Sequence, residues 1–314
     1  MNYLFTNILG SFVFDNNIRL IDKALFDSLE DYQNRDRFEK KLKAKHKRLE
    51  IPEGKKLSAI LDFFRDKRHF GGFYQRNMEI TVRDVKGSVS NDLLIIQAIN
   101  SIEDLTKAIN MLITRLREWY SLHNPEFSNS VESHEKFIEL VVSKDKKELL
   151  RSLGVKESMG ADLSKENLAP IMSLAKEIKS VFELKEKQER YLESIMKKGC
   201  ANMLEITGVQ LGAKLIEYAG SLKQLVLFPA STIQLLGAEK ALFRHIKNKK
   251  NLCPKYGILH EHPLVIRSKK KNQGKAARII ADKISIAVKV DYFKGKFIGD
   301  KLRKEVEKKI KGSE

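Results

Sequence analysis

Residues 91–122 carry an apolar repeat whose members are separated by steps of four and three residues. Such an a/d seam, held for about four heptads, is typical of a long helix that pairs with another helix. Asn124 and Pro125 predict where this helix ends, because the residue before a proline is biased away from the α conformation. The seam positions are Ile95, Ile99, Ile102, Thr106, Ile109, Ile113, Leu116 and Tyr120.

Residues 168–196 carry a second, weaker seam, in which Lys185 and Glu189 occupy two seam positions. Two long helices predict an antiparallel hairpin that protrudes from the body, with residues 125–167 as its tip. The alternative is a pair of core helices in a globular bundle, but the strongly charged outer faces favour the hairpin. A protruding hairpin has to cover its seam, so we expect a homodimer. The residues expected at the dimer contact are Ile99, Ile102, Ile109, Ile113, Leu116, Ile171 and Ile178.

The N-terminal part of the chain is expected to form a small α+β domain. Residues 10–20 are interpreted as two short strands around a turn at Asp15, Asn16 and Asn17. Charged, helix-like sequence follows over residues 23–48, and residues 74–85 are interpreted as a further strand.

Basic charge is concentrated in the C-terminal third of the chain. From Gly199 to Glu314, 24 Lys or Arg stand against 10 Asp or Glu, a net of +14 within a total of +18. The remaining +4 belongs to residues 1–198. Such a concentration attracts polyanions, because each neutralised phosphate releases condensed counterions. We expect nucleic acid and no membrane, since no run of 18 or more apolar residues exists and no signal peptide is recognisable. Two cysteines suit a reducing compartment.

Residues 228–247 predict a basic helix. Ser231 and Gln234 have the spacing of a capping box, so the helix is expected to begin near Thr232. Lys240, Arg244 and Lys247 then form one stripe. The opposite face is expected to pack into a core through Leu235, Leu242 and Ile246. An ordinary amphipathic helix with a solvent-exposed basic face is the competing interpretation.

Residues 267–278 form a second basic segment, with six cations in twelve residues. Together with Lys249 and Lys250, which follow the stripe, this segment favours a phosphate-binding surface over an ordinary charged loop. Phe243 borders the stripe and could stack on a base or pack in a core, and His245 points away from it.

Catalytic and metal-binding patterns are absent from the sequence. Gly208 to Lys214 lacks the spacing of a phosphate-binding loop, and no nucleophile elbow exists. His260 and His262 are not completed by a cysteine or carboxylate cluster, so no metal site is expected. We therefore expect no catalysis and no cofactor.

Six segments of the C-terminal third closely resemble the Nop domain of box C/D ribonucleoproteins. They are GAKLI (212–216), AGSL (219–222), FPASTIQLLGAEKALFR (228–244), PKYGIL (254–259), KAARIIADKISIA (275–287) and DYF (291–293). LREWYSLHNPE (116–126) is similar to the end of the first coiled-coil helix in this family, and YLFTN (3–7) and GSFVFD (10–15) match its N-terminal domain loosely. The length is most similar to that of the archaeal proteins of the family.

This resemblance implies a non-catalytic scaffold for guide-directed 2′-O-methylation of RNA. The implied partners are a box C/D guide RNA with a kink-turn, a small ribosomal-type kink-turn-binding protein, the methyltransferase fibrillarin, bound by the N-terminal domain, and a second copy of the chain. An archaeal protein would be cytoplasmic, and a eukaryotic relative nucleolar.

The resemblance also assigns the C-terminal residues. The expected RNA-binding residues are Gln234, Lys240, Phe243, Arg244, His245, Lys247, Lys249, Lys250, Arg267, Lys269, Lys270, Lys271, Lys275 and Arg278. Exposed side chains at Ile233, Leu236 and Glu239 are expected to contact the kink-turn-binding protein.

The sequence thus predicts a mostly α chain with three parts: an α+β N-terminal domain (1–85), a long antiparallel coiled-coil hairpin (86–198) and an all-α basic Nop domain (199–314). Two other functions remain open. One is an enzyme that acts on RNA through a site dispersed in the sequence. The other is a purely structural coiled-coil protein whose basic C-terminal part only keeps it in solution.

Overall fold

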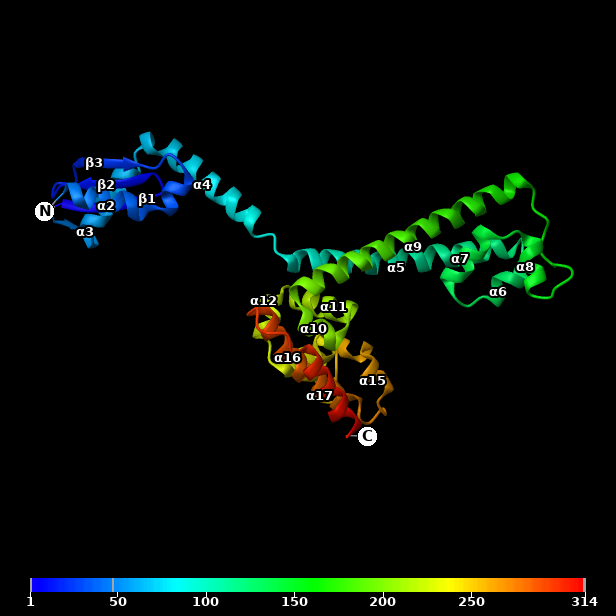
Figure 1. Ribbon diagram of the computed structural model, residues 1–314. Helices are drawn as coiled ribbons and strands as arrows, with labels where there is room; N and C mark the ends of the chain where they lie inside the picture. Colours follow the sequence, from blue (N-terminus) through cyan, green and yellow to red (C-terminus); the bar gives the residue numbers. More distant parts are fainter. Residues whose placement is uncertain (1, 47, 313–314) are drawn as a thin grey trace. The chain divides into compact units, whose positions relative to one another are not determined.

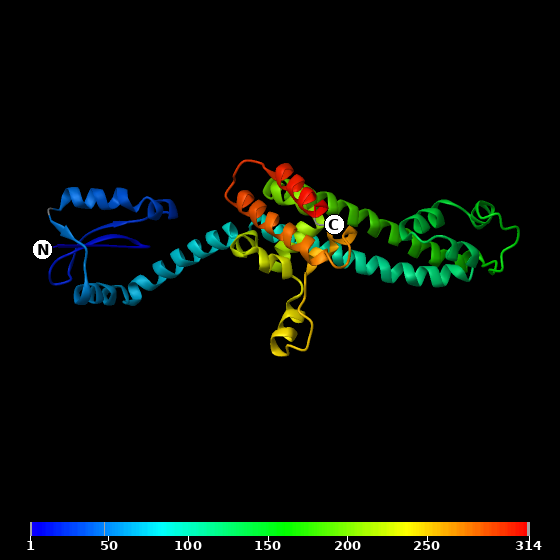
Figure 2. The ribbon, with the colours of Figure 1, turned by 90° about the horizontal axis from the view of Figure 1, so that it is seen from below.

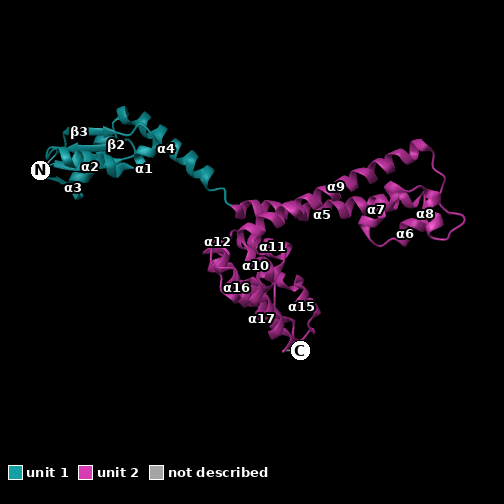
Figure 3. Ribbon diagram, viewed as in Figure 1, with its two compact units in different colours: residues 1–90 teal, residues 91–314 magenta. Residues whose placement is uncertain are grey.

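The computed structural model describes residues 2–46 and 48–312. It is mostly α-helical, as the sequence predicts, and it divides into two compact units, residues 1–90 and 91–314 (Figure 3). Among the described helices, none combines the length and the apolar character needed to cross a bilayer.

The first unit is a small sheet with a helix on each face (Figures 1 and 2). Every residue of the central strand β2 is buried, because its side chains point alternately toward the two faces of the sheet and a helix covers each face. Phe12 and Phe14 pack against α3 on one face, and Val13 packs against Leu42 of α2 on the other. The strand order is β3-β2-β1-β4, antiparallel except for the β1–β4 pair. The elements are β1 (Asn2–Asn7), β2 (Gly10–Phe14), β3 (Leu20–Leu25), α1 (Leu29–Gln33), α2 (Arg35–Lys45), β4 (Leu49–Glu50), α3 (Gly54–Phe64) and α4 (Lys67–Gly87).

Two strands around an Asp-Asn-Asn turn are confirmed in this unit, while two other expectations are wrong. The Asp15 carboxylate closes the turn by accepting hydrogen bonds from the backbone N–H groups of Asn17 and Arg19, both at 2.8 Å. Residues 23–25 continue β3 and are not helical. Residues 74–85 are helical and not a strand, because their apolar side chains recur at helical spacing within α4.

The predicted antiparallel hairpin is formed by α5 (Asn91–Ser121) and α9 (Lys165–Gly199), which lie side by side (Figure 1). Ile113 and Tyr120 of the first seam are buried in one cluster with Ile171 and Ile178 of the second. At the other end of the hairpin, Ile95 is buried with Leu192 and Met196. The two charged seam positions of α9 form an ion pair with each other, with 3.8 Å between Lys185 Nζ and Glu189 Oε1, and both side chains remain partly exposed.

The burial of this seam corrects the expected dimer contact. The seven residues assigned to it are between 0% and 3% exposed in a single chain. Their side chains are covered by the other helix of the same hairpin, so they are not available to a second copy. The residues corrected are Ile99, Ile102, Ile109, Ile113, Leu116, Ile171 and Ile178.

The tip of the hairpin is organised by Arg117. Its guanidinium donates hydrogen bonds to the carbonyl oxygens of Ser128 and Val131, each at 2.7 Å, and lies 4.2 Å from the ring centre of Phe137. One side chain thereby closes the end of a short helix and holds the next helix on α5. The tip helices are α6 (Pro125–Ser130), α7 (His134–Ser143) and α8 (Lys146–Ser152).

The C-terminal helices share one core with the base of the hairpin. The central α16 packs against α10, α12, α13 and α17. Gly220 ends α11 in the left-handed conformation (φ 81°), as the sequence predicts. The predicted division at residue 198 lies within this compact unit and stays a prediction. The elements are α10 (Ala201–Thr207), α11 (Val209–Ala219), α12 (Leu222–Leu227), α13 (Ala230–Leu235), α14 (Glu239–Lys247), η1 (Ile258–Glu261), α15 (Pro263–Arg267), α16 (Gln273–Tyr292) and α17 (Gly299–Lys311).

The Asp291 carboxylate joins three of these helices. It accepts hydrogen bonds from Asn202 N (3.0 Å), Asn202 Nδ2 (2.8 Å) and Met203 N (2.8 Å) at the beginning of α10. Asn202 Oδ1 in turn accepts a 2.6 Å hydrogen bond from Ile298 N, just before α17. The end of α16 is thus fixed to the beginnings of α10 and α17.

We predict that Ile113→Ala lowers the free energy of unfolding of the second unit by about 2–5 kcal/mol, since the substitution leaves a cavity in the closed seam. Leu93→Ala is the control, because this side chain lies on the same helix and is 45% exposed. We expect the control to change stability by no more than about 0.5 kcal/mol in denaturant titrations. Equal effects of the two substitutions would contradict a buried seam.

Candidate nucleic-acid interface

The basic helix predicted over residues 232–247 is two helices, α13 and α14. Gly237 lies between them with φ 83°, a conformation that a glycine adopts at least cost. Two backbone hydrogen bonds hold the break: Gly257 N donates to Gln234 O (2.8 Å), and Ile258 N donates to Leu236 O (2.7 Å). A single straight helix would lose both bonds, so the break is a fixed feature of the fold.

The predicted capping box at Ser231 is also wrong. The residue that precedes α13 is Pro229, and no side chain caps the helix. The amide of Gln234 instead donates a 2.6 Å hydrogen bond to Lys255 O. This bond ties the helix to the following loop.

The break leaves α14 on a projecting arm, residues 237–252, drawn yellow in Figure 2. No residue of α14 is buried, and Ile246 is 56% exposed, so the expectation that its apolar face packs into a core is wrong. Lys240, Arg244 and Lys247 are exposed and share one side of the helix. Phe243, next to this stripe, is 66% exposed.

The arm is closed by its own polar groups. His245 Nδ1 donates a 2.6 Å hydrogen bond to Asn251 O, and Asn251 Nδ2 donates a 3.0 Å bond to Arg244 O. These contacts fold the loop back onto the end of α14 and leave Lys249 and Lys250 exposed. His245 therefore has a structural role within the arm.

The residues expected to contact a partner protein are placed differently. The side chains of Ile233 and Leu236 are 0% and 5% exposed, because they anchor the break in the core shared with α16. The expectation that they are exposed is wrong. Glu239 is exposed, and its carboxylate accepts a 2.7 Å hydrogen bond from Gly237 N.

Beside the arm lies a basic groove of about 470 Å³ between α13, the loop after the arm and the beginning of α16. Four cations line it, all exposed, and none has an ion-pair partner within residues 2–46 and 48–312. The positive end of the 20-residue helix α16 adds to their field. The cations are Lys255, Lys271, Lys275 and Arg278. We call this surface the groove.

The structure also revises the basic segment 267–278. It is not a continuous loop, because α15 ends at Arg267 and α16 begins at Gln273. The turn between them exposes Lys269 and Lys270. Lys255 is a groove residue that the sequence analysis missed, since no periodic or charge pattern surrounds it. The Gln234–Lys255 hydrogen bond, together with the backbone bonds of Gly257 and Ile258, places it beside α13.

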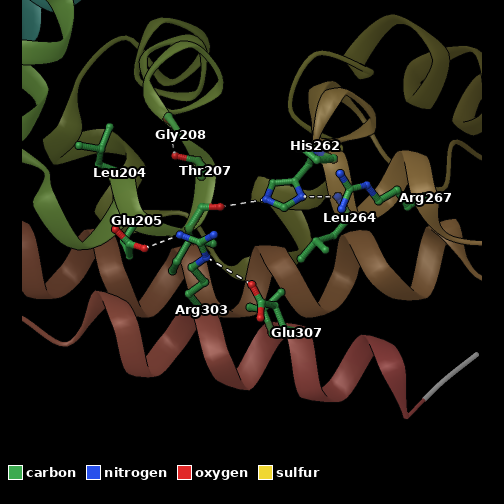
Figure 4. A pocket seen from close by; sticks show the side chains of 12 residues that line it. Leu204, Glu205, Thr207, Gly208, His262, Leu264, Arg267, Arg303 and Glu307 are labelled. Atoms are coloured by element: carbon green, nitrogen blue, oxygen red, sulfur yellow. Dashed lines mark hydrogen bonds and ion pairs between the residues drawn. The ribbon is translucent and has the colours of Figure 1, made fainter.

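A second pocket, of about 410 Å³, lies between α10, α15 and α17 (Figure 4). His262 Nε2 donates to Ile206 O (2.9 Å), and its Nδ1 accepts from Leu264 N (3.1 Å). Arg303 pairs with Glu205 (2.6 Å) and Glu307 (3.3 Å). These polar groups already bond one another, so they offer no free acid–base pair. Nowhere in residues 2–46 and 48–312 do three His, Cys, Asp or Glu side chains gather as a metal site.

Burial lowers the pKa of His262 below its usual value of 6.5, although the hydrogen bond to Ile206 O opposes the shift. The unfolded chain therefore binds a proton that the folded chain excludes. We predict that the contribution of neutral His262 to the free energy of unfolding is fully present above about pH 6.5. This contribution is lost as the pH falls through the folded-state pKa. His262→Asn keeps a hydrogen-bonding side chain that does not titrate here.

The measurement is the free energy of unfolding at about pH 7.5 and about pH 5.5. We expect the wild-type chain to lose more stability between these values than His262→Asn does. Identical losses would mean that His262 does not titrate differently in the folded and unfolded chains.

Comparison with known proteins identifies several relatives. A family model described as "Nop: snoRNA binding domain, fibrillarin" matches residues 101–312. An uncharacterized NOP5 family protein of Methanocaldococcus jannaschii is 38% identical over 79% of this chain and 63% of its own length. Nucleolar protein 56 of Schizosaccharomyces pombe is 36% identical over 79% of this chain and 54% of its own. The human nucleolar protein 56 is 35% identical over 70% of this chain and 41% of its own.

The chain thus spans less than two thirds of the length of these relatives. A solved structure of a fibrillarin/Nop5p complex aligns with 98% of this chain and 99% of its own, at 22% identity. Its TM-score of 0.45 is too low to bear on fold or function. The match of the family model extends over well more than half of the sequence and includes both the arm and the groove, and on this ground the chain belongs to the Nop family.

Proposed function

We propose that this protein is a non-catalytic RNA-binding scaffold of a box C/D ribonucleoprotein. It joins a fibrillarin-type methyltransferase to a kink-turn RNA and its kink-turn-binding protein, for guide-directed 2′-O-methylation. The observation that carries the proposal is the groove, whose four cations lack carboxylate partners among the described residues, beside an arm with no buried residue. Membership of the Nop family, whose description names snoRNA and fibrillarin, supports this choice of partners.

The proposed RNA contacts divide between the arm and the groove. Lys240, Arg244 and Lys247 hold phosphates along the exposed side of the arm, and Phe243 stacks on an unpaired base. Lys275 and Arg278 hold phosphates at the beginning of α16. Phosphate contacts position the RNA and carry little sequence information, so specificity comes from RNA shape and from the kink-turn-binding protein.

The methyltransferase is proposed to bind the first unit at an apolar stripe of α4. Phe70, Tyr74 and Met78 are 70%, 62% and 47% exposed, and they continue into Val82 and Val85 at the same helical spacing. An exposed stripe of this length is typical of a protein-binding surface. No other function of the first unit is suggested by its described residues.

Self-association is proposed through the outer faces of the hairpin, because its seam is closed. Met111, Leu184 and Tyr191 are exposed large side chains on these faces.

The M. jannaschii and nucleolar relatives support a cytoplasmic protein of an archaeal cell, with nucleolar counterparts in eukaryotes.

Replacement of Lys255, Lys271 and Lys275 by alanine is expected to weaken binding to kink-turn RNA assembled with its kink-turn-binding protein. The slope of log K against log salt should become shallower by about one for each phosphate that the variant no longer neutralises. Gel-shift titrations at several salt concentrations measure both quantities. Wild-type binding that is independent of salt would contradict a phosphate-binding groove.

The matched control replaces three exposed lysines of the first unit, Lys40, Lys41 and Lys43, by alanine. The net charge changes equally, but every groove cation is kept. If the control weakened binding as much as the groove variant, the effect would come from total charge and not from a site. Equal affinity for any RNA, with or without the kink-turn-binding protein, would count against the composite surface.

Tyr74→Asp with Met78→Asp is expected to reduce affinity for a purified fibrillarin-type methyltransferase by at least about tenfold, because a charge in a buried interface is costly. Arg83→Glu, an exposed change on the opposite side of the same helix that alters the net charge by the same two units, should leave binding unchanged. Isothermal titration measures the affinity, and circular dichroism checks that α4 remains helical. Undiminished binding of the double variant would place the methyltransferase elsewhere.

A further inference from the structure

The link between α16 and α17 exposes three aromatic side chains in a short stretch. Tyr292, Phe293 and Phe297 are 37%, 73% and 55% exposed. The rings of Tyr292 and Phe293 are 5.2 Å apart and nearly perpendicular, so each presents a face to its surroundings. Aromatic side chains this exposed beside a well-packed core usually mark a contact surface.

Lysines alternate with these rings along the link. Lys294 and Lys296 lie between Phe293 and Phe297, and Lys289 precedes them near the end of α16; all three are exposed. The described parts of the chain contain no ion-pair partner for any of the three. The nearby carboxylate of Asp291 accepts its hydrogen bonds from the backbone and side chain at the beginning of α10. The link is therefore aromatic, basic and not neutralised by its own acid.

The backbone holds Lys294 in an unusual conformation. Gly295 N donates to Val290 O (2.8 Å) and Lys294 N to Asp291 O (3.1 Å), the pair of bonds that ends a helix in a Schellman motif. In this motif the left-handed position, which favours glycine, falls on Lys294, with φ 53°. A lysine occupies the strained position although a glycine follows it directly. Strain of this kind concentrates at functional positions.

We propose that this link is a second RNA site, which binds a single-stranded segment by stacking bases on Phe293 and Phe297 and by holding phosphates with Lys294 and Lys296. Stacking on aromatic rings with cations along the backbone is the common way to bind single strands without sequence preference. The inference goes beyond the proposed function, because it assigns RNA contact to a surface that is neither arm nor groove.

The link lies apart from the groove. The groove is at the beginning of α16 and the link is at its end, and a 20-residue helix spans about 30 Å. Figure 2 shows the link, in orange to red, on the opposite side of the C-terminal helices from the yellow arm. One RNA that reached both sites would run the length of α16.

The interleaving of charge and rings favours nucleic acid over a protein partner. A protein-binding patch is typically depleted in lysine at its centre, whereas here a lysine stands between each ring and the central Gly295. Successive unpaired bases have faces to stack and phosphates at regular intervals. Both needs are met within five residues of the link.

The test uses the full chain and a fluorescent single strand of about a dozen nucleotides without a kink-turn. Phe293→Ala with Phe297→Ala should lower affinity by about tenfold in anisotropy titrations. Tyr218→Ala, a ring on α11 that is 51% exposed and lies outside the link, the groove and the hairpin, is the matched control and should change little. Binding to kink-turn RNA with its protein partner should stay within about twofold for all variants, which separates this site from the groove.

Lys294→Gly gives an independent test that does not depend on losing a ring. Glycine relieves the left-handed strain, so the thermal unfolding temperature should stay the same or rise. Affinity for the single strand should nevertheless fall by about threefold, with a shallower salt dependence. If both variants bound the single strand as tightly as the wild-type chain does, the proposal would be overturned. This holds also if the variants had lost binding to a protein partner, because the link would then be a protein-binding surface. If the groove variants lost kink-turn binding while this site behaved as expected, the two proposals would still stand separately.

Discussion

The Asp291 carboxylate is the contact on which the arrangement of the C-terminal helices depends. It receives three hydrogen bonds from the beginning of α10, and Asn202 passes the connection on to α17. An acidic group beside helix N–H groups satisfies donors that a helix leaves unpaired, and it does so close to the core. With its end fixed in this way, α16 presents a different surface at each end. Its beginning presents the cations of the groove, and its end presents the aromatic and basic link.

The hairpin likewise combines a few polar contacts with an apolar core. Its seam is closed by α5 and α9 of one chain, and Arg117 holds the tip through carbonyl oxygens and the Phe137 ring. A closed seam makes the hairpin stable without a second copy, so any self-association has to use its outer faces. The base of the hairpin enters the core of the C-terminal helices. The tip, the arm and the groove are therefore parts of one compact unit.

The first unit and the C-terminal helices expose different chemistry, and this difference supports a scaffold. The stripe of α4 is apolar, whereas the arm, the groove and the link are basic. Apolar and basic surfaces select different partners: another protein in the first case, phosphates in the second. A chain with two such surfaces, and with the polar groups of its second pocket already bonded to one another, suits the joining of an enzyme to its RNA.

The sequence by itself determined the helical hairpin, the Asp15 turn, the Gly220 helix end and the concentration of positive charge, because periodicity, turn chemistry and composition are local properties. Tertiary structure decided the rest. Whether Ile233 faces solvent depends on what packs against it, and the break at Gly237 depends on hydrogen bonds to Gly257 and Ile258, twenty residues away. Lys255 is placed in the groove by hydrogen bonds between its loop and α13, including the one from Gln234. The α4 helix was mistaken for a strand because short apolar runs fit both periods. Local patterns can specify elements and net charge, but the surface that those elements present is set by contacts between residues far apart in the chain.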